Sequence, residues 1–99
     1  MITGKQRSYL KSLANGIEAT VFIGKDDITE NIINEIDNIL EAREIVKVKI
    51  QESCLLDPKE TANELAGRLK AEFVQAIGRK FVLYRMAHDK EKRTIVLPK

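Results

Sequence analysis

Apolar residues recur along this chain with two different spacings. In residues 28–40 they return every third or fourth position, which predicts a helix with one apolar stripe and an otherwise polar, largely acidic surface. In residues 46–50 they alternate strictly with Lys47 and Lys49, which predicts a strand with one buried face and two ammonium groups on the other. The apolar stripe of the helix comprises Ile28, Ile32, Ile33, Ile36, Ile39 and Leu40. The chain therefore combines amphipathic helices with half-buried strands.

Capping patterns predict where two helices begin. Asp27 stands three residues before Glu30, the spacing of a capping box at a helix start. Asp57 precedes Pro58, whose missing N–H costs nothing in a first turn, and this helix is expected to run to about Lys70. Its buried side would comprise Ala62, Leu65, Ala66 and Leu69.

The remaining elements are predicted from the spacing of apolar residues and from the residues typical of turns. A first helix is expected from about Thr3 to Ala14, with a left-handed stop at Asn15-Gly16. Glycine at the first turn position suits a type II′ hairpin at Gly78-Arg79. The strands outside residues 46–50 are predicted at Ala19–Ile23, Phe73–Ile77 and Lys80–Tyr84, and Thr94–Leu97 is a candidate for a further strand.

The order of elements predicts an α/β fold. The sequence α-β-α-β-α-β-β contains two strand-helix-strand units followed by a hairpin, which gives a two-layer domain with a small mixed sheet. We expect residues 1–99 to form this single domain, because no linker, repeat or low-complexity tract interrupts them. The side on which the first helix packs stays open.

Composition excludes several classes of protein. The 43% hydrophobic and 32% charged residues are ordinary for a globular domain, and no apolar run approaches the ~20 residues of a membrane span. The polar N-terminal segment lacks the apolar core of a signal peptide, which predicts a cytoplasmic location. Cys54 and His88 are the only residues of their types, so we expect no disulfide, no metal site and no cofactor.

Charge is unevenly distributed along the chain. Residues 1–11 hold three bases and no acid, and residues 79–99 hold seven bases against two acids. Residues 24–44 hold seven acids against two bases. If the two ends of the chain share one side of the fold, they form a basic face able to neutralise phosphates, although a solvated charged surface would have the same composition.

Catalysis has little support in the sequence. The candidate nucleophiles have no plausible partner, because the lone His88 lies in a charged segment that reads as an exposed loop. The chain also lacks the glycine-rich motifs that bind nucleotide phosphates. The candidate nucleophiles are Ser8, Ser12, Ser53 and Cys54. We therefore predict that the protein is not an enzyme.

Two loops offer contacts for phosphate. In residues 24–27 a glycine and a lysine precede a helix N-terminus, although ordinary turn chemistry explains the same residues. The hairpin residues Gly78, Arg79 and Lys80, with Arg85 beyond them, place three cations near one tight turn. Tyr84 could stack on a base or lie in the core. The 5% aromatic content and absence of tryptophan argue against a stacking platform and favour recognition of backbone and shape.

The chain resembles the CRM domain family, named for chloroplast RNA splicing and ribosome maturation, in its bacterial single-domain YhbY-like form. The resemblance spans nearly the whole chain. The residues that carry it are Lys5-Gln6 with Leu10, Leu13 and Ala14, Val21 to Lys25 followed by Ile28-Thr29, Glu44 to Ile50, and Gly78 followed by Val82 to Arg85. Such resemblance implies a fold similar to the C-terminal domain of translation initiation factor three, and association with precursors of the large ribosomal subunit.

The resemblance also implies a loop similar to the GxxG phosphate clamp of the KH domain. By position this loop falls on residues 24–27, but Asp27 replaces the closing glycine and Asp26 precedes it. Two carboxylates there would repel phosphate and weaken such a clamp. We therefore expect the main RNA contacts to come from the strands and the hairpin instead. The candidate RNA-binding residues are Lys47, Lys49, Gly78, Arg79, Lys80 and Arg85, supported by Gly24 and Lys25 and by Lys5, Arg7 and Lys11.

The primary hypothesis is an RNA-binding protein that binds ribosomal RNA in large (50S) subunit precursors through a basic surface and assists assembly. The alternative is a protein-interaction module that docks on ribosomal proteins through the acidic face of the helix at residues 28–40. Neither hypothesis needs a membrane or a small-molecule substrate. A monomer is the default expectation for a chain without an obvious exposed apolar stripe.

Overall fold

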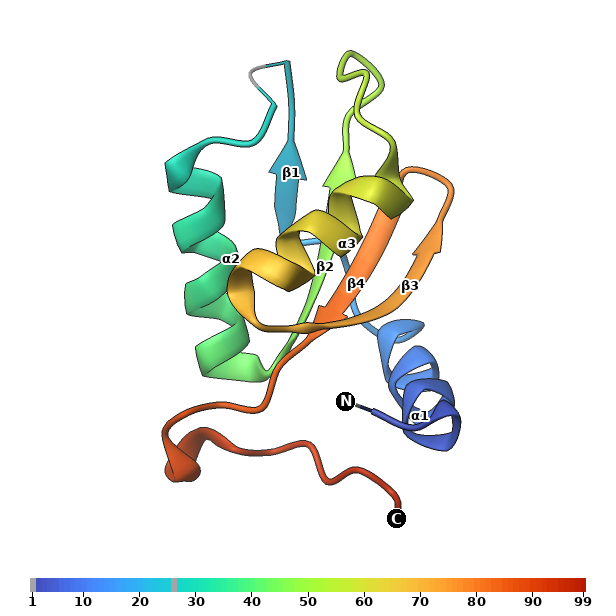
Figure 1. The fold of residues 1–99 in the computed structure, drawn as a ribbon, viewed down its shortest axis with the longest axis vertical. Helices are drawn as coiled ribbons and strands as arrows, with labels where there is room; N and C mark the ends of the chain where they lie inside the picture. Colours follow the sequence, from blue (N-terminus) through green and yellow to red (C-terminus); the bar gives the residue numbers. More distant parts are fainter. Residues whose placement is uncertain (1, 26) are drawn as a thin grey trace.

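The computed structural model describes residues 2–25 and 27–99, and its elements follow the predicted order. They are α1 (Gly4–Ala14), β1 (Val21–Ile23), α2 (Glu30–Arg43), β2 (Ile45–Ile50), α3 (Pro58–Leu69), β3 (Glu72–Ile77), β4 (Lys80–Tyr84) and a short 3₁₀ turn at Lys90–Lys92. The four strands form one sheet in the order β1-β2-β4-β3 (Figure 1). β1 and β2 run parallel, and the other neighbours are antiparallel. The predicted mixed sheet is therefore confirmed.

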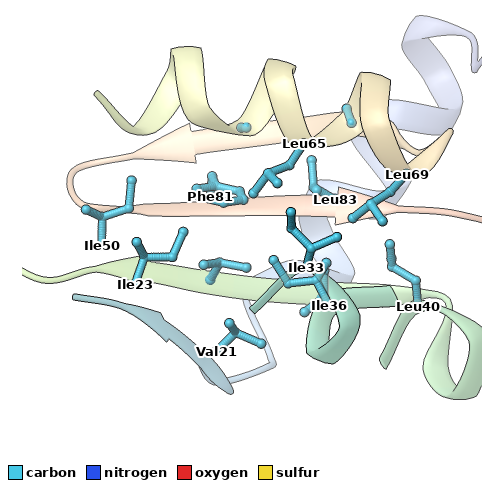
Figure 2. Packing of buried hydrophobic residues seen from close by; sticks show 14 of the residues in the cluster. Val21, Ile23, Ile33, Ile36, Leu40, Ile50, Leu65, Leu69, Phe81 and Leu83 are labelled. Carbon is cyan, nitrogen blue, oxygen red and sulfur yellow. The ribbon is translucent and has the colours of Figure 1, made fainter. Parts of the chain in front are cut away.

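One face of the sheet is covered by α2 and α3. The strict alternation in β2 buries Val46, Val48 and Ile50 on this face, as the sequence predicts. Ile36 and Leu40 of α2 pack against the same face (Figure 2). On α3 the buried residues include the four predicted ones, Ala62, Leu65, Ala66 and Leu69. This layer forms the larger of the two hydrophobic clusters.

The opposite face is covered only in part. Val82 and Tyr84 of β4 point away from α2 and α3, into a second cluster with Leu10 and Ala14 of α1. The partly buried Ile95 and Leu97 pack against the same cluster, which means that the segment after β4 also lies on this side of the sheet. This arrangement answers the question that the sequence left open, since α1 packs on the face opposite α2 and α3.

The predicted start of α2 at Asp27 is wrong. The helix begins at Glu30, and its cap is Thr29, whose side-chain oxygen accepts a hydrogen bond of 3.2 Å from the amide of Ile32. Asp27 instead takes a left-handed conformation with φ of 59°, and its carboxylate accepts a bond from the thiol of Cys54. A long-range contact has therefore displaced the local capping pattern.

Two further expectations need correction. Asn15 ends α1 in a right-handed conformation, with φ of −65°, rather than a left-handed one. Residues 94–97 do not form a strand of the sheet, and the amides of Thr94 and Ile95 instead donate to the side chain of Glu44. The cap at Asp57 and the positive φ of Gly78 agree with the sequence. Thr3, expected as the first residue of α1, is instead its cap.

Candidate RNA-binding surface

Three connections meet at one end of the sheet, at the top of Figure 1: the β1–α2 loop, the β2–α3 loop and the β3–β4 hairpin. The β1–α2 loop is held against its neighbour, because the amide of Gln51 donates to the carbonyl of Ile23 at 2.8 Å. A Cβ atom at Gly24 would lie 2.9 Å from the side-chain oxygen of Gln51. The Gln51 side chain is exposed and flexible, so its amide could shift to accept a larger residue at this position. Lys25 lies in the same loop as an exposed cation. Asp26 lies outside the described residues.

Arg79 holds the β2–α3 loop in place. Its Nε donates to the carbonyl of Ile50 at 3.3 Å, and its Nη2 donates to the carbonyls of Gln51 at 3.1 Å and Cys54 at 2.7 Å. In return, the carbonyl of Arg79 accepts a hydrogen bond of 2.7 Å from the amide of Ile50. Several donors of this guanidinium are thus occupied by the protein, and its structural role is to position the loop rather than to offer an open clamp.

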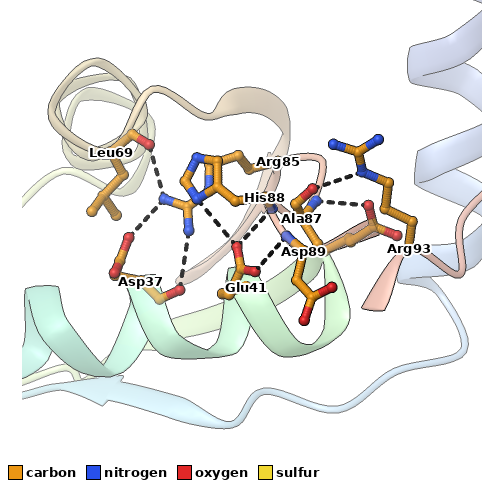
Figure 3. Close-up of polar contacts among 9 residues, drawn as sticks. Asp37, Glu41, Leu69, Arg85, Ala87, His88, Asp89 and Arg93 are labelled. Carbon is orange, nitrogen blue, oxygen red and sulfur yellow. Dashed lines mark hydrogen bonds and ion pairs between the residues drawn. The ribbon is translucent and has the colours of Figure 1, made fainter. Parts of the chain in front are cut away.

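Arg85 is buried, contrary to its predicted role as an RNA contact. Its Nη1 donates to the Asp37 carboxylate at 2.7 Å and to the Leu69 carbonyl at 3.1 Å, as Figure 3 shows. Only 9% of its side chain is exposed. Tyr84 is likewise buried, so of its two interpretations the structure supports the core aromatic. Arg85 joins α2 to the end of α3 and does not reach a ligand surface.

Lys49 and Lys80 lie side by side on the sheet face opposite α2 and α3. Their Cα atoms are register partners of the antiparallel β2–β4 pair, and directly paired residues point to the same face. The parallel β1–β2 register places Phe22 beside Lys49, and the hairpin register places Ile77 beside Lys80. One residue from each strand thus forms a line across the sheet, Phe22, Lys49, Lys80 and Ile77, which we call the cross-strand row.

The cross-strand row is open to solvent. Phe22 is 51% exposed and Ile77 is 65% exposed, and Lys80 is exposed as well. Among the described residues, the side-chain ammonium groups of Lys49 and Lys80 have no hydrogen-bond or ion-pair partner on the protein. The sequence identified both lysines but not Phe22. The available signal was that Phe22 alternates with the buried Val21 and Ile23, so that it must point to the other face.

The remaining predicted cations lie nearer α1. The Lys47 ammonium donates to the Ile17 carbonyl at 2.9 Å, which anchors the chain between α1 and β1. Arg7 and Lys11 of α1, with Lys59 of α3, line an open groove of about 670 Å³ along the edge strand β3. Arg7 also donates to the Phe73 carbonyl at 3.1 Å.

The groove and the cross-strand row adjoin each other. Ile77 ends the row and also lines the groove, so Lys11 and Lys80 belong to one continuous surface. Gly78 lies exposed in the adjoining turn. Lys5 is further away, where its ammonium donates to the Lys99 carbonyl at 3.2 Å. This contact confirms that the two ends of the chain share one side of the fold.

The described residues offer little for other chemistry. Residues 2–25 and 27–99 contain no group of three histidine, cysteine or carboxylate side chains that could hold a metal ion. Within the same ranges, no helix has the length and apolar character needed to cross a bilayer.

Known proteins resemble this chain along almost its entire length. The CRS1 / YhbY (CRM) domain matches residues 2–85. This chain belongs to the CRM domain family. Two relatives support the match: "Probable RNA-binding protein YqeI" of Bacillus subtilis is 37% identical over 98 residues, covering 99% of this chain and 100% of the relative. An "RNA-binding protein" of Haemophilus influenzae is 34% identical over 98 residues, covering 99% of this chain and 96% of the relative.

A solved structure shows the same CRM fold. The solution structure of the hypothetical protein SAV1595 from Staphylococcus aureus is 42% identical, and the comparison covers 99% of this chain and 100% of that one, with a TM-score of 0.79. The family resemblance and the α/β fold that the sequence predicts are therefore both confirmed.

The acidic face of α2 in this CRM domain is largely occupied by the protein itself. The Glu41 carboxylate accepts hydrogen bonds from the amides of Asp89 at 3.0 Å and His88 at 2.8 Å, which hold the pKa of Glu41 below its ordinary value (Figure 3). Asp37 pairs with Arg85. These acids thus hold the residues that follow β4, most of which lie beyond the matched range of the family.

Proposed function

We propose that this CRM protein binds ribosomal RNA in precursors of the large (50S) ribosomal subunit and thereby assists assembly. The observation that supports the proposal is the pair of Lys49 and Lys80, two neighbouring ammonium groups on a rigid sheet face. Like charges directly opposite each other on a sheet are destabilising unless a ligand compensates them. A phosphate backbone laid across the row would neutralise both and release counterions.

The shape of the basic surface extends this argument. The cross-strand row runs into the groove between α1 and α3, where Lys11 and Lys59 supply further cations. Lys25 stands on the loop that follows β1, the strand that carries Phe22. An RNA that follows this path would contact five lysines from five different parts of the chain, four of them exposed and Lys49 half-buried. The ribosomal target itself rests on the family resemblance.

The experiment is a salt series with large-subunit ribosomal RNA fragments and a tRNA control. Each phosphate contact contributes roughly −0.7 to −0.9 to the slope of log K against log salt. The double variant K49A/K80A should weaken binding and make the slope shallower by that amount for each lysine. The matched control is K90A/K92A, which removes the same charge from the exposed 3₁₀ turn at the other end of α2.

The outcomes separate the parts of the proposal. Selective binding to a large-subunit fragment, lost in K49A/K80A and retained in K90A/K92A, supports both the target and the surface. Equal loss in both variants would show that only net charge matters. Binding that ignores salt, or equal affinity for tRNA, contradicts the proposal.

The structure does not favour docking of ribosomal proteins on the acidic face of α2. Asp37, Glu41 and Glu44 are engaged within the chain, and Glu30 faces Arg68 at 3.6 Å. Among the described acids of this face, Glu35 remains exposed without such a contact. Glu35→Ala should therefore leave association with ribosomal particles unchanged, and impaired association would revive this alternative.

A further inference from the structure

We infer that Phe22 is a stacking position for one unpaired base, and that the cross-strand row therefore recognises a single-stranded segment of RNA. This inference deepens the proposed function and rests on it. It also differs from the sequence-based expectation, which favoured recognition of backbone and shape without stacking.

The exposure of Phe22 is not explained by the fold. Its neighbours Val21 and Ile23 are fully buried, whereas half of the Phe22 side chain faces solvent. Among the described residues, Phe22 belongs to neither hydrophobic cluster. A β-branched residue would suit this position of a strand equally well and would expose less apolar surface. The aromatic ring is thus available to a ligand.

The register places the Phe22 ring beside the cationic side chain of Lys49. Neighbouring strands lie about 4.8 Å apart, so the ring and the two ammonium groups fall within the span of a nucleotide or two. Single-stranded RNA presents a phosphate at every step and a free base face where it is unstacked. The row offers one partner for each of these groups. An apolar protein partner would instead have to desolvate both lysines without compensating them.

A duplex would not use this position. Bases within a helix are stacked on both sides, so only an unpaired base can present its face to an aromatic ring. The other aromatics limit the site to one stack near the row. Phe81 and Tyr84 are buried, Phe73 is partly buried and packs against the larger hydrophobic cluster, and Tyr9 lies on α1. The low aromatic content thus excludes an extended platform but leaves a single stacking position.

The first test compares a single-stranded oligoribonucleotide with a duplex of the same length by fluorescence anisotropy. Phe22→Leu keeps an apolar side chain but removes the aromatic face. It should weaken single-strand binding by about 5- to 150-fold, the range that corresponds to one stacked base, and leave duplex binding unchanged. The salt slope should stay that of the wild type, because no charge is altered. The matched control is Tyr9→Leu, which removes an exposed aromatic ring that belongs neither to the row nor to the groove lining and should change neither affinity.

The second test detects stacking of a base on the residue 22 side chain directly, by fluorescence. The chain contains no tryptophan, so Phe22→Trp places its single tryptophan at the site, where emission can be excited selectively above the absorption of the two tyrosines. Its emission should be quenched by the single strand and unaffected by the duplex, with wild-type affinity retained. Circular dichroism of each variant verifies that the fold is intact.

The outcomes distinguish this inference from the proposed function. Full single-strand affinity in Phe22→Leu, or equal weakening for duplex and single strand, would overturn the stacking position while RNA binding stands. Unquenched Phe22→Trp emission at saturating single strand would overturn it as well. Failure of the wild-type protein to bind any RNA would instead remove the proposed function, and the inference with it.

Discussion

The Glu44 carboxylate accepts a hydrogen bond of 2.8 Å from the backbone amide of Ala87, and neither residue is exposed to solvent. The other carboxylate oxygen accepts bonds from the amides of Thr94 at 2.8 Å and Ile95 at 3.0 Å. One side chain at the end of α2 thus binds three amides of the segment that follows β4. The sequence predicts that residues 94–97 pair with a neighbouring strand. The Glu44 carboxylate instead accepts the hydrogen bonds of the first two amides of this segment.

This relationship predicts a large effect of Glu44 on stability. Glu44→Ala leaves three amides without their acceptor, and a buried unsatisfied donor costs about 1–3 kcal/mol. We expect a loss of roughly 3 kcal/mol or more in the free energy of unfolding, measured by urea titration with circular dichroism. Glu44→Gln should lose less, because its amide keeps one acceptor oxygen. Glu35→Ala on the exposed side of the same helix is the control, and an equal loss there would contradict the assignment.

The same carboxylate makes stability depend on pH. Burial raises the pKa of Glu44, but the hydrogen bonds from Ile95, Ala87 and Thr94 and the charge of Arg93 together outweigh it and lower the pKa below the ordinary 4.5. A carboxylate with a lowered folded pKa stabilises the protein above its unfolded pKa, and this contribution is lost as the pH falls through the folded value. We therefore expect the free energy of unfolding to fall as the pH drops below 4.5.

The measurement is a series of urea titrations from neutral to acidic pH. Glu44→Gln should show a smaller decrease than the wild type, because it has no proton to gain at this position. The amides of Asp89 and His88 also lower the pKa of Glu41. The stability of Glu44→Gln should therefore still decrease somewhat at acidic pH. Identical pH profiles for the two proteins would show that Glu44 does not contribute.

Two glycines should respond to alanine in opposite directions. Gly67 lies exposed inside α3, and a Cβ atom there would meet nothing within 4 Å, so Gly67→Ala should stabilise the protein by about 1 kcal/mol. Gly78 has a positive φ of 59°, so Gly78→Ala should destabilise it by about 1–2 kcal/mol. Urea midpoints of the two variants measure both effects. Destabilisation by Gly67→Ala would indicate that α3 has a close neighbour at this position.

Elements with a strong local signal were predictable from the sequence. The alternation in β2 fixes its buried face, and Asp57 with Pro58 fixes the start of α3, because each depends only on neighbouring residues. The predicted start of α2 was wrong because it depends on a residue far away in the sequence. Asp27 and Thr29 are both good caps, and the contact of Asp27 with Cys54 in a distant loop decides between them.

The candidate site was predictable only in part, since charge along the sequence does not reveal burial. Lys80 is an exposed cation and Lys49 a half-buried one on the solvent side of the sheet, as a basic hairpin and an alternating strand suggest. Arg85 carries the same charge but is buried against Asp37, which lies 48 positions earlier in the chain. Phe22 was missed because β1 has only three residues, too few for alternation to stand out. Strand order and register supplied what the sequence lacked.

The contrast between Arg85 and Lys80 gives the last prediction. Arg85→Ala removes the partner of Asp37 and the donor to the Leu69 carbonyl, although the half-exposed Asp37 can regain water. We expect a loss of about 2 kcal/mol in stability, less than for a fully buried ion pair, with the RNA affinity of the folded protein unchanged. Lys80→Ala should leave stability within about 0.5 kcal/mol and weaken RNA binding. Thermal unfolding and binding isotherms of the two variants test both halves. If Arg85→Ala weakened binding at a temperature where the variant is fully folded, Arg85 would have to reach the RNA, and the surface drawn through Lys49 and Lys80 would need to extend around the end of β4.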